Sequence, residues 1–172
     1  MAYTTRWGDG VRLLLAALLL AVLSGCGWRL AGSGLDQKPL GAVYLQAQSG
    51  LGGGTSGVLA GILAFTRDTT IVNKAEDADL HIIIMADVTQ RRIVALSGAG
   101  RVREIELVLN VRFAVRDRGV YILPANDIQF RQIVSYDDAQ ALGREAEIAL
   151  LINTMQQDAA TQILRRIYAI RK

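Results

Sequence analysis

Cysteine and histidine each occur only once in the 172 residues. A single thiol cannot form a disulfide within one chain, so a disulfide framework is excluded. A structural zinc site built from these two residue types needs several of them, and it is excluded for the same reason. The chain also has no large excess of charge of one sign, because 19 basic and 16 acidic residues leave a formal net charge of +3. That small excess implies no strong field for binding polyanions.

The chain has an apolar run near its start that is too short to span a membrane. Residues 13–23 form 11 uninterrupted apolar positions, whereas a spanning helix needs about 20. Arg6 and Arg12 precede the run, and small residues follow it. This order is typical of a secretory signal peptide. A buried N-terminal helix is the alternative, but no polar residue interrupts the run to give it an amphipathic face.

The only cysteine follows this run directly, in Leu23-Ser24-Gly25-Cys26. An apolar residue, two small residues and a cysteine resemble a bacterial lipobox, in which the thiol receives a diacylglyceryl group. The small residues allow a peptidase to cut just before the modified cysteine. The sequence therefore predicts a lipoprotein signal peptide at residues 1–25 and lipidation of Cys26. Gly27, in place of Asp, favours the outer membrane over retention in the inner membrane.

The remainder of the chain is long enough for one domain. Removal of residues 1–25 leaves 147 of the 172 residues, and a domain of this size can bury a core without disulfides. A hydrophobic content of 51% excludes a disordered chain. Residues 26–40 contain Gly32, Ser33, Gly34 and Pro39, which predicts a lipidated tether. We expect the folded domain at residues 41–172.

Alternating apolar residues predict two long strands at residues 80–96 and 101–116. The turn Ser97-Gly98-Ala99-Gly100 joins them into an antiparallel hairpin. A period of two places one set of side chains on the core face and the other on a wetter face. His81, Asp87 and Thr89 fall on the wetter face. The predicted core-facing residues are Leu80, Ile82, Ile84, Ala86 and Val88 in the first strand, and Ile105, Leu107, Leu109, Val111, Phe113 and Val115 in the second.

The other segments complete an α+β fold. Residues 41–48 and 121–134 favour strands, Thr69–Val72 is compatible with a strand that leads into a turn, and residues 55–67 favour a short helix. A long final helix follows, for which Ser135 or Asp137 can serve as the N-cap. We predict a four-stranded, mostly antiparallel sheet with two helices packed on one face. The apolar stripe of the final helix is Ile148, Leu151, Ile152, Met155, Ala159, Ile163, Ile167 and Ile170.

Enzymatic motifs find no support in the chain. Residues 52–57 match the G-x-G-x-x-G pattern, but the antiparallel hairpins that follow are not a dinucleotide-binding fold, so a flexible glycine turn is favoured. His81 has no partner at ligand spacing and is expected on the solvent side of a strand. Glu104 and Glu106 share one strand face, yet they alternate with apolar residues as a solvated face does. We therefore expect no catalytic residue, no metal and no cofactor.

Four arginines gather toward the closed end of the long hairpin: Arg91, Arg92, Arg101 and Arg103. Arginine forks hold anionic oxygens through paired hydrogen bonds, so a basic hairpin end suits phosphate or sugar-acid recognition. The alternative is a solubilising end that resists edge pairing, and composition alone favours it.

Three segments resemble a family of LPS-assembly lipoproteins, the LptE family. The likeness covers nearly all of the mature chain. The segments are Cys26-Gly27-Trp28-Arg29-Leu30, then Gly100-Arg101-Val102-Arg103-Glu104-Ile105-Glu106-Leu107, and finally Ser135-Tyr136-Asp137-Asp138 with Ala141-Leu142-Gly143-Arg144-Glu145-Ala146-Glu147, Met155 and Ile163-Leu164-Arg165-Arg166.

The resemblance implies a non-enzymatic outer-membrane lipoprotein that plugs the LptD β-barrel, faces the periplasm and helps to place lipopolysaccharide in the outer leaflet. In that family, basic residues near the hairpin tip and early in the last helix are implicated in contacting lipopolysaccharide. Arg144 matches the helix position, and Arg101 lies in the neighbourhood of the tip position. The predicted lipopolysaccharide-binding residues are thus Arg91, Arg92, Arg101, Arg103 and Arg144.

Two other functions stay open at this point. One is a structural or trafficking lipoprotein of the outer membrane that does not contact lipopolysaccharide. The other is a periplasmic nucleotide-dependent enzyme, which depends on the glycine motif alone.

Overall fold

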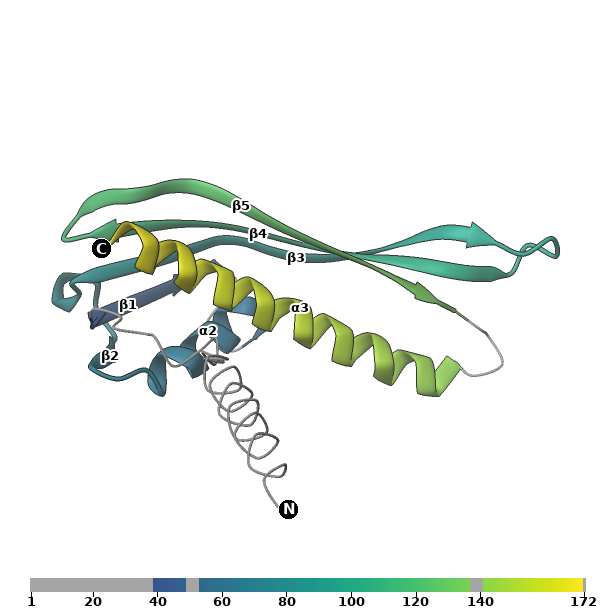
Figure 1. Ribbon diagram of the computed structural model, residues 1–172, viewed down its shortest axis with the longest axis horizontal. Helices are drawn as coiled ribbons and strands as arrows, with labels where there is room; N and C mark the ends of the chain where they lie inside the picture. Colours follow the sequence, from purple (N-terminus) through teal and green to yellow (C-terminus); the bar gives the residue numbers. More distant parts are fainter. Residues whose placement is uncertain (1–38, 49–52, 137–140, 172) are drawn as a thin grey trace, which may run out of the picture. The chain divides into compact units, whose positions relative to one another are not determined.

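The computed structural model describes residues 39–48, 53–136 and 141–171. The predicted signal peptide, Cys26 and most of the predicted tether lie outside these residues. Within the described residues, the domain contains five strands, two helices and one 3-10 turn (Figure 1). In chain order they are β1 (Gly41–Ala47), α2 (Gly54–Ala64), β2 (Thr69–Val72), the 3-10 turn Ala75–Asp77, β3 (Leu80–Leu96), β4 (Val102–Asp117), β5 (Val120–Ser135) and α3 (Ala141–Ile170).

All strands belong to one sheet, with the order β2-β1-β3-β4-β5. β1 runs parallel to β2 and β3, whereas β3, β4 and β5 form an antiparallel meander. The predicted number of four strands is therefore wrong by one, because Thr69–Val72 pairs with β1 as an edge strand. Its parallel direction follows from the connection, since α2 crosses over the sheet and returns the chain in the direction of β1.

Both helices cover the same face of the sheet, as predicted, and the core lies between them and the strands (Figure 1). The opposite side of the sheet is called the open face below. The odd-numbered core residues predicted for β4 are confirmed, because all of them from Leu107 to Val115 are fully buried and Ile105 is partly buried. From α3, Ile148, Ile163 and Ile167 are fully buried against them. Burial of such side chains stabilises the fold by about 1.5–3 kcal/mol each.

A β-bulge at Met85 reverses the facing of side chains along β3. Ile84 pairs with Phe113 and Ala86 with Arg112, so Met85 has no partner in β4. Before the bulge even-numbered residues face the core, as predicted. From Asp87 to Ile93 odd-numbered residues do, until the register shifts again between Ile93 and Leu96. The prediction was therefore wrong for Ala86 and Val88, and Val88 is 46% exposed. Asp87, Thr89 and Arg91 face the helices instead, opposite Val111, Leu109 and Leu107.

The long final helix is confirmed as α3, and its predicted stripe is largely buried. The exception is Ile170, which is 46% exposed at the last residue of α3. Ser135 cannot be the N-cap, because it is the last residue of β5; Asp137 lies outside the described residues. Within those residues, no helix combines the length and the apolar character that crossing a membrane requires.

Candidate functional site

The hairpin tip, defined here as residues 93–103, is closed by a small hydrogen-bonded turn. The Ser97 amide donates to the Arg101 carbonyl at 2.7 Å, and the Arg101 amide donates to Ser97 Oγ at 3.1 Å. Gly100 adopts a φ of +72°, which glycine accepts without steric cost. The turn thus fixes the backbone beside Arg101 and Arg103, whose side chains are both exposed.

Exposed aliphatic side chains accompany these two arginines. Ile93, Val94 and Leu96 are 61%, 48% and 59% exposed, because β3 and β4 extend beyond the part of the sheet that the helices cover. The hairpin tip therefore offers cationic and apolar groups side by side. This combination matches amphiphiles with phosphorylated headgroups better than purely polar ligands.

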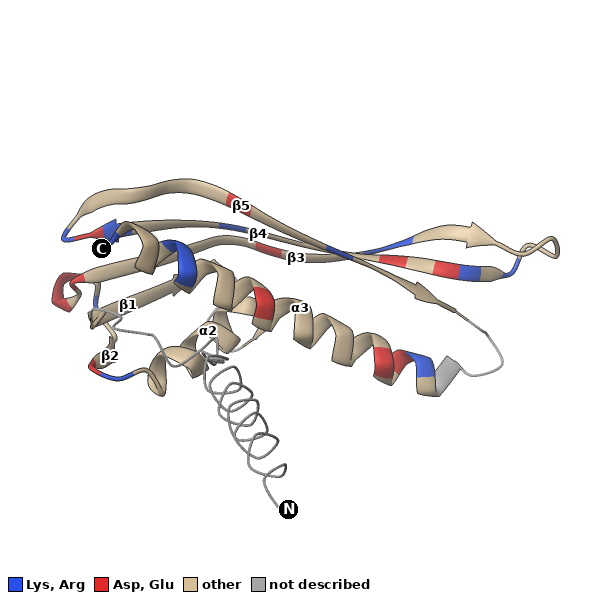
Figure 2. Cartoon of the chain, in the orientation of Figure 1, with Lys and Arg blue, Asp and Glu red and all other residues tan. Residues whose placement is uncertain are grey.

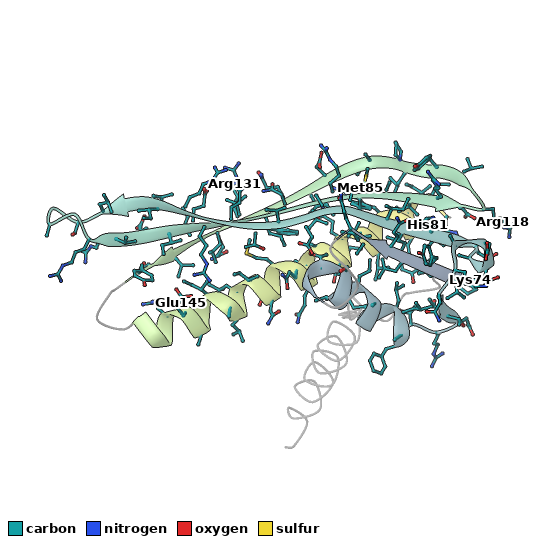
Figure 3. All side chains as sticks on the ribbon, turned by 180° about the vertical axis from the view of Figure 1, so that it is seen from behind. Lys74, His81, Met85, Arg118, Arg131 and Glu145 are labelled. Carbon is teal, nitrogen blue, oxygen red and sulfur yellow. The ribbon has the colours of Figure 1, made fainter. Side chains whose placement is uncertain are left out.

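Arg91 faces α3 and forms a two-pronged contact with Glu145. Its Nη1 donates to Glu145 Oε2 at 2.9 Å and to Oε1 at 3.1 Å. The pair joins β3 to the first turns of α3, where Glu145 lies (Figure 3). The side chains are 46% and 49% exposed, so both remain accessible to solvent.

Arg144 is one residue away from Glu145 and is paired with a different carboxylate. Its Nη1 contacts Glu147 Oε2 at 2.5 Å, within α3 itself. The Arg144 side chain is 23% exposed and the Glu147 side chain 49%. Arg144, Glu145 and Glu147 thus lie near the start of α3, and Arg91 of β3 contacts them through Glu145. Figure 2 shows charges of both signs in the first turns of α3. The spacing of three residues on a helix could have indicated the Arg144–Glu147 pair from sequence, but the Arg91–Glu145 pair required the bulge to be known.

The predicted arginines do not all share one face. Arg92 pairs with Glu106 in the register, so it lies on the open face, where its Nη2 donates to Gln90 Oε1 at 3.0 Å. Arg103 has no partner in β3, because the register shifts between Ala95 and Leu96. The structure therefore brings Arg91 and Arg144 to the same end of α3, and it separates Arg92 from them.

The glycine segment opens α2, but a carboxylate already occupies its N-terminus. Asp87 Oδ2 accepts a hydrogen bond from the Thr55 amide at 2.6 Å. Gly54 has a φ of +62°, and a Cβ there would lie 2.4 Å from Asp87 Oδ2. A negative group at this end of a helix is stabilising, and it repels a phosphate from the place where a dinucleotide would bind. Gly54 allows the close approach of Asp87, a role that sequence reasoning missed.

His81 lies on the open face and is partly covered by its neighbours (Figure 3). Its Nε2 is 3.0 Å from Gln46 Oε1, and its ring centroid is 4.8 Å from that of Tyr44. Burial lowers the pKa of His81, and the nearby charge of Arg116 lowers it further. No group of three or more potential metal ligands occurs within the described part of the chain.

A row of polar side chains crosses β4 and β5 on the same face. Arg112 donates to Asp127 through Nε at 2.8 Å and through Nη2 at 3.0 Å. These hydrogen bonds lower the pKa of Asp127 and raise that of Arg112. Next to them, Gln129 donates to Asn110 at 2.6 Å. Glu104 and Glu106 also lie on this face, which confirms that they belong to a solvated sheet surface.

A family model described as LptE, lipopolysaccharide-assembly, matches residues 46–167. The LPS-assembly lipoprotein LptE of Yersinia enterocolitica serotype O:8 / biotype 1B is 27% identical over 161 residues. That alignment covers 93% of this chain and 76% of the Yersinia protein.

Solved structures of lipoproteins share the fold. An uncharacterized lipoprotein B from Nitrosomonas europaea is 34% identical with a TM-score of 0.70, over 84% of this chain and 92% of that one. The rare lipoprotein B from Shewanella oneidensis is 25% identical with a TM-score of 0.65, over 76% and 96%. A minor lipoprotein from Acinetobacter baumannii is 21% identical with a TM-score of 0.60, over 77% of this chain and 93% of that one. This last likeness shows the fold alone.

Proposed function

The chain belongs to the LptE family of lipopolysaccharide-assembly proteins, which are not enzymes, and from this premise we propose that it plugs and supports the assembly of an LptD-type β-barrel in the outer membrane. In this role it takes part in the transport of lipopolysaccharide and its insertion into the outer leaflet. The observation that carries the proposal is the family match over residues 46–167, which spans the domain from β1 to α3.

The proposed organisation places the domain at the periplasmic side of the outer membrane. Residues 1–25 act as the export signal, Cys26 carries the lipid, residues 26–40 form the tether and residues 41–172 form the domain. Several acyl chains on one residue give stable attachment, because a single chain binds a membrane only weakly. The open face then supplies polar side chains, such as Arg112 and Gln129, that suit the polar interior of a barrel.

The proposed ligand surface consists of arginines at the hairpin tip and at the start of α3. Guanidinium groups bind phosphate through paired, charge-assisted hydrogen bonds, and Ile93, Val94 and Leu96 add exposed apolar area beside them. Lipopolysaccharide presents phosphates and acyl chains together, so both kinds of group are used. The proposed residues are Arg91 and Arg144 on the helix side, Arg101 and Arg103 at the hairpin tip, and Arg92 on the open face of the same hairpin end.

Co-purification tests the partner. The tagged full-length chain, extracted from membranes in mild detergent, should bring down a β-barrel protein in a stoichiometric amount. The Cys26→Ser variant, expressed with the same signal, controls for capture that depends on the anchor alone. Recovery of the chain without any barrel would reject the plug role and would favour a lipoprotein adaptor.

Substitution tests the ligand surface. Arg91→Ala combined with Arg144→Ala should weaken binding of lipopolysaccharide to the purified chain by about tenfold or more, since a hydrogen bond to a charged group is worth about 1.5–3 kcal/mol. Arg131→Ala is the matched control, because Arg131 lies on the open face and donates to Gln129 (Figure 3). Equal binding by the double variant and the control would reject these residues as the site.

A further inference from the structure

We propose that Glu145 and Glu147 compete with the phosphates of the ligand for Arg91 and Arg144, and that they thereby set how fast the ligand is released. The inference rests on the proposed function, because it concerns the same arginines. It adds two acidic residues to a site that otherwise consists of cations and apolar side chains.

The contact at Arg91 already has the form of an anion complex. Both carboxylate oxygens of Glu145 accept hydrogen bonds from Arg91 Nη1, at 2.9 and 3.1 Å. A phosphate presents oxygens of the same kind to a guanidinium. A phosphate that binds Arg91 through this group must therefore displace Glu145 or share the guanidinium with it.

Arg144 is engaged in the same way by Glu147, at 2.5 Å between Nη1 and Oε2. Arg91 of β3 and Arg144 of α3 thus each hold a carboxylate. In contrast, Arg101 and Arg103 at the hairpin tip form no ion pair with another described residue. Arg101 and Arg103 are therefore ready for a first contact with the ligand, whereas Arg91 and Arg144 must first exchange their carboxylate partners.

The exchange is energetically accessible. Both glutamates are 49% exposed, so water can solvate the carboxylate that a ligand displaces. Ion pairs with this exposure are weak, and each lowers the affinity of a competing anion by about two- to fivefold. A phosphate monoester carries about −1.5 to −2 charges at neutral pH, so it can replace a carboxylate at an arginine. The glutamates therefore weaken the site without closing it.

A weakened site suits a protein that passes its ligand on. A surface of unpaired arginines would hold a molecule with several phosphates tightly, and release would become slow. Internal carboxylates lower the barrier to release, because they re-form their hydrogen bonds with the arginines as each phosphate departs.

The test compares release rates in glutamine variants of the full-length chain in detergent. Lipopolysaccharide is the probe, and its association and dissociation are followed by surface plasmon resonance. Glu145→Gln with Glu147→Gln should lower the dissociation rate and the dissociation constant by about fivefold or more. Glu104→Gln is the matched control, since it removes one carboxylate at the same hairpin end but on the open face. It should change the dissociation rate and the dissociation constant by less than twofold. Raising the salt concentration should shrink the difference.

The outcomes separate this inference from the proposed function. Release that is unchanged, or faster, in the double glutamine variant overturns the inference even if Arg91→Ala with Arg144→Ala weakens binding as expected. Wild-type protein that does not bind lipopolysaccharide at all overturns the proposed ligand surface and the inference together. A purely structural role of the ion pairs would lower the unfolding temperature of the double glutamine variant without tightening binding, which also counts against the inference.

Discussion

At the scale of single residues, Asp87 and Gly54 show how a motif can serve the fold while resembling a cofactor site. The bulge turns Asp87 toward the helices, and its carboxylate accepts the hydrogen bond of the Thr55 amide at the start of α2. Gly54 lies so close that no side chain fits between them. Within the glycine pattern at residues 52–57, the described close contact is therefore the packing of Gly54 against a carboxylate.

Gly54→Ala should destabilise the domain by about 1–3 kcal/mol, because a Cβ would meet Asp87 Oδ2 at 2.4 Å and the backbone φ is positive. The free energy of unfolding in urea measures the effect. Gly61→Ala is the control, since nothing lies within 4 Å of its Cβ position in the interior of α2. That substitution should stabilise the domain by up to about 1 kcal/mol. Equal effects of the two substitutions would contradict the proposed packing of Gly54.

His81 gives the domain a dependence on pH. Its pKa is lowered in the folded state, first by burial and second by Arg116, so the unfolded chain takes up the proton more readily. The stability associated with neutral His81 is present above the unfolded pKa of about 6.5, and it is lost as the pH falls through the lower folded pKa. Urea midpoints at pH 7.5 and 5.5 should differ less for His81→Gln than for the wild type. An identical difference in both proteins would show that other groups cause it.

At the scale of elements, the long periodic segments were predictable from sequence and the irregular ones were not. The hairpin and α3 each bury one face, so their apolar residues recur regularly in the sequence. The spacing is two residues in the hairpin strands and three or four residues in α3. β2 has only four residues, and its place depends on pairing with β1 rather than on its own composition. The bulge at Met85 adds one residue without any local signature, so Asp87 and Thr89 were assigned to the wrong face. The contacts of Asp87 with α2 and of Arg91 with α3 were missed for the same reason.

Ile163→Ala tests the packing of α3 on the sheet. Ile163 is fully buried, so its truncation should cost about 2–5 kcal/mol through lost burial and a residual cavity. Leu150→Ala is the control on the same helix, because Leu150 is 70% exposed and its truncation should change stability by no more than about 0.5 kcal/mol. Thermal and urea unfolding provide the measurement. A similar cost for both variants would mean that this part of α3 is not docked as described.

At the scale of the whole molecule, one sheet joins two kinds of architecture. β1 pairs with β2 and β3 through short parallel ladders, whereas β3, β4 and β5 form an antiparallel meander in which β3 and β4 extend beyond α3 (Figure 1). Both parts contribute to the core, whereas most of the proposed ligand residues belong to the second part. The sequence predicted the second part better, because local hairpin connections leave a clearer pattern than parallel pairing across a crossover. The candidate ligand residues were found only as a group, and their division between two faces required the register.

The proposed anchor predicts how the whole chain partitions in the cell. Cys26→Ser removes the only thiol, so the chain should lose its acyl groups and move from the membrane pellet to the periplasmic fraction. Fractionation with intact-mass measurement of the purified protein reports both changes. An unmodified wild-type cysteine, or retention of the variant in the membrane in the absence of a barrel partner, would contradict the proposed anchor.

The unpaired Met85 determines which side chains face the core from Ala86 to Ile93 in β3. Replacing its side chain should be tolerated, because it is 41% exposed. Deleting the residue would be a different kind of change, since every later side chain of β3 would exchange inside for outside. The carboxylate that anchors α2 and the guanidinium that meets α3 would then both point into solvent. For the facing of the β3 side chains, the presence of an extra residue at position 85 therefore matters more than which residue it is.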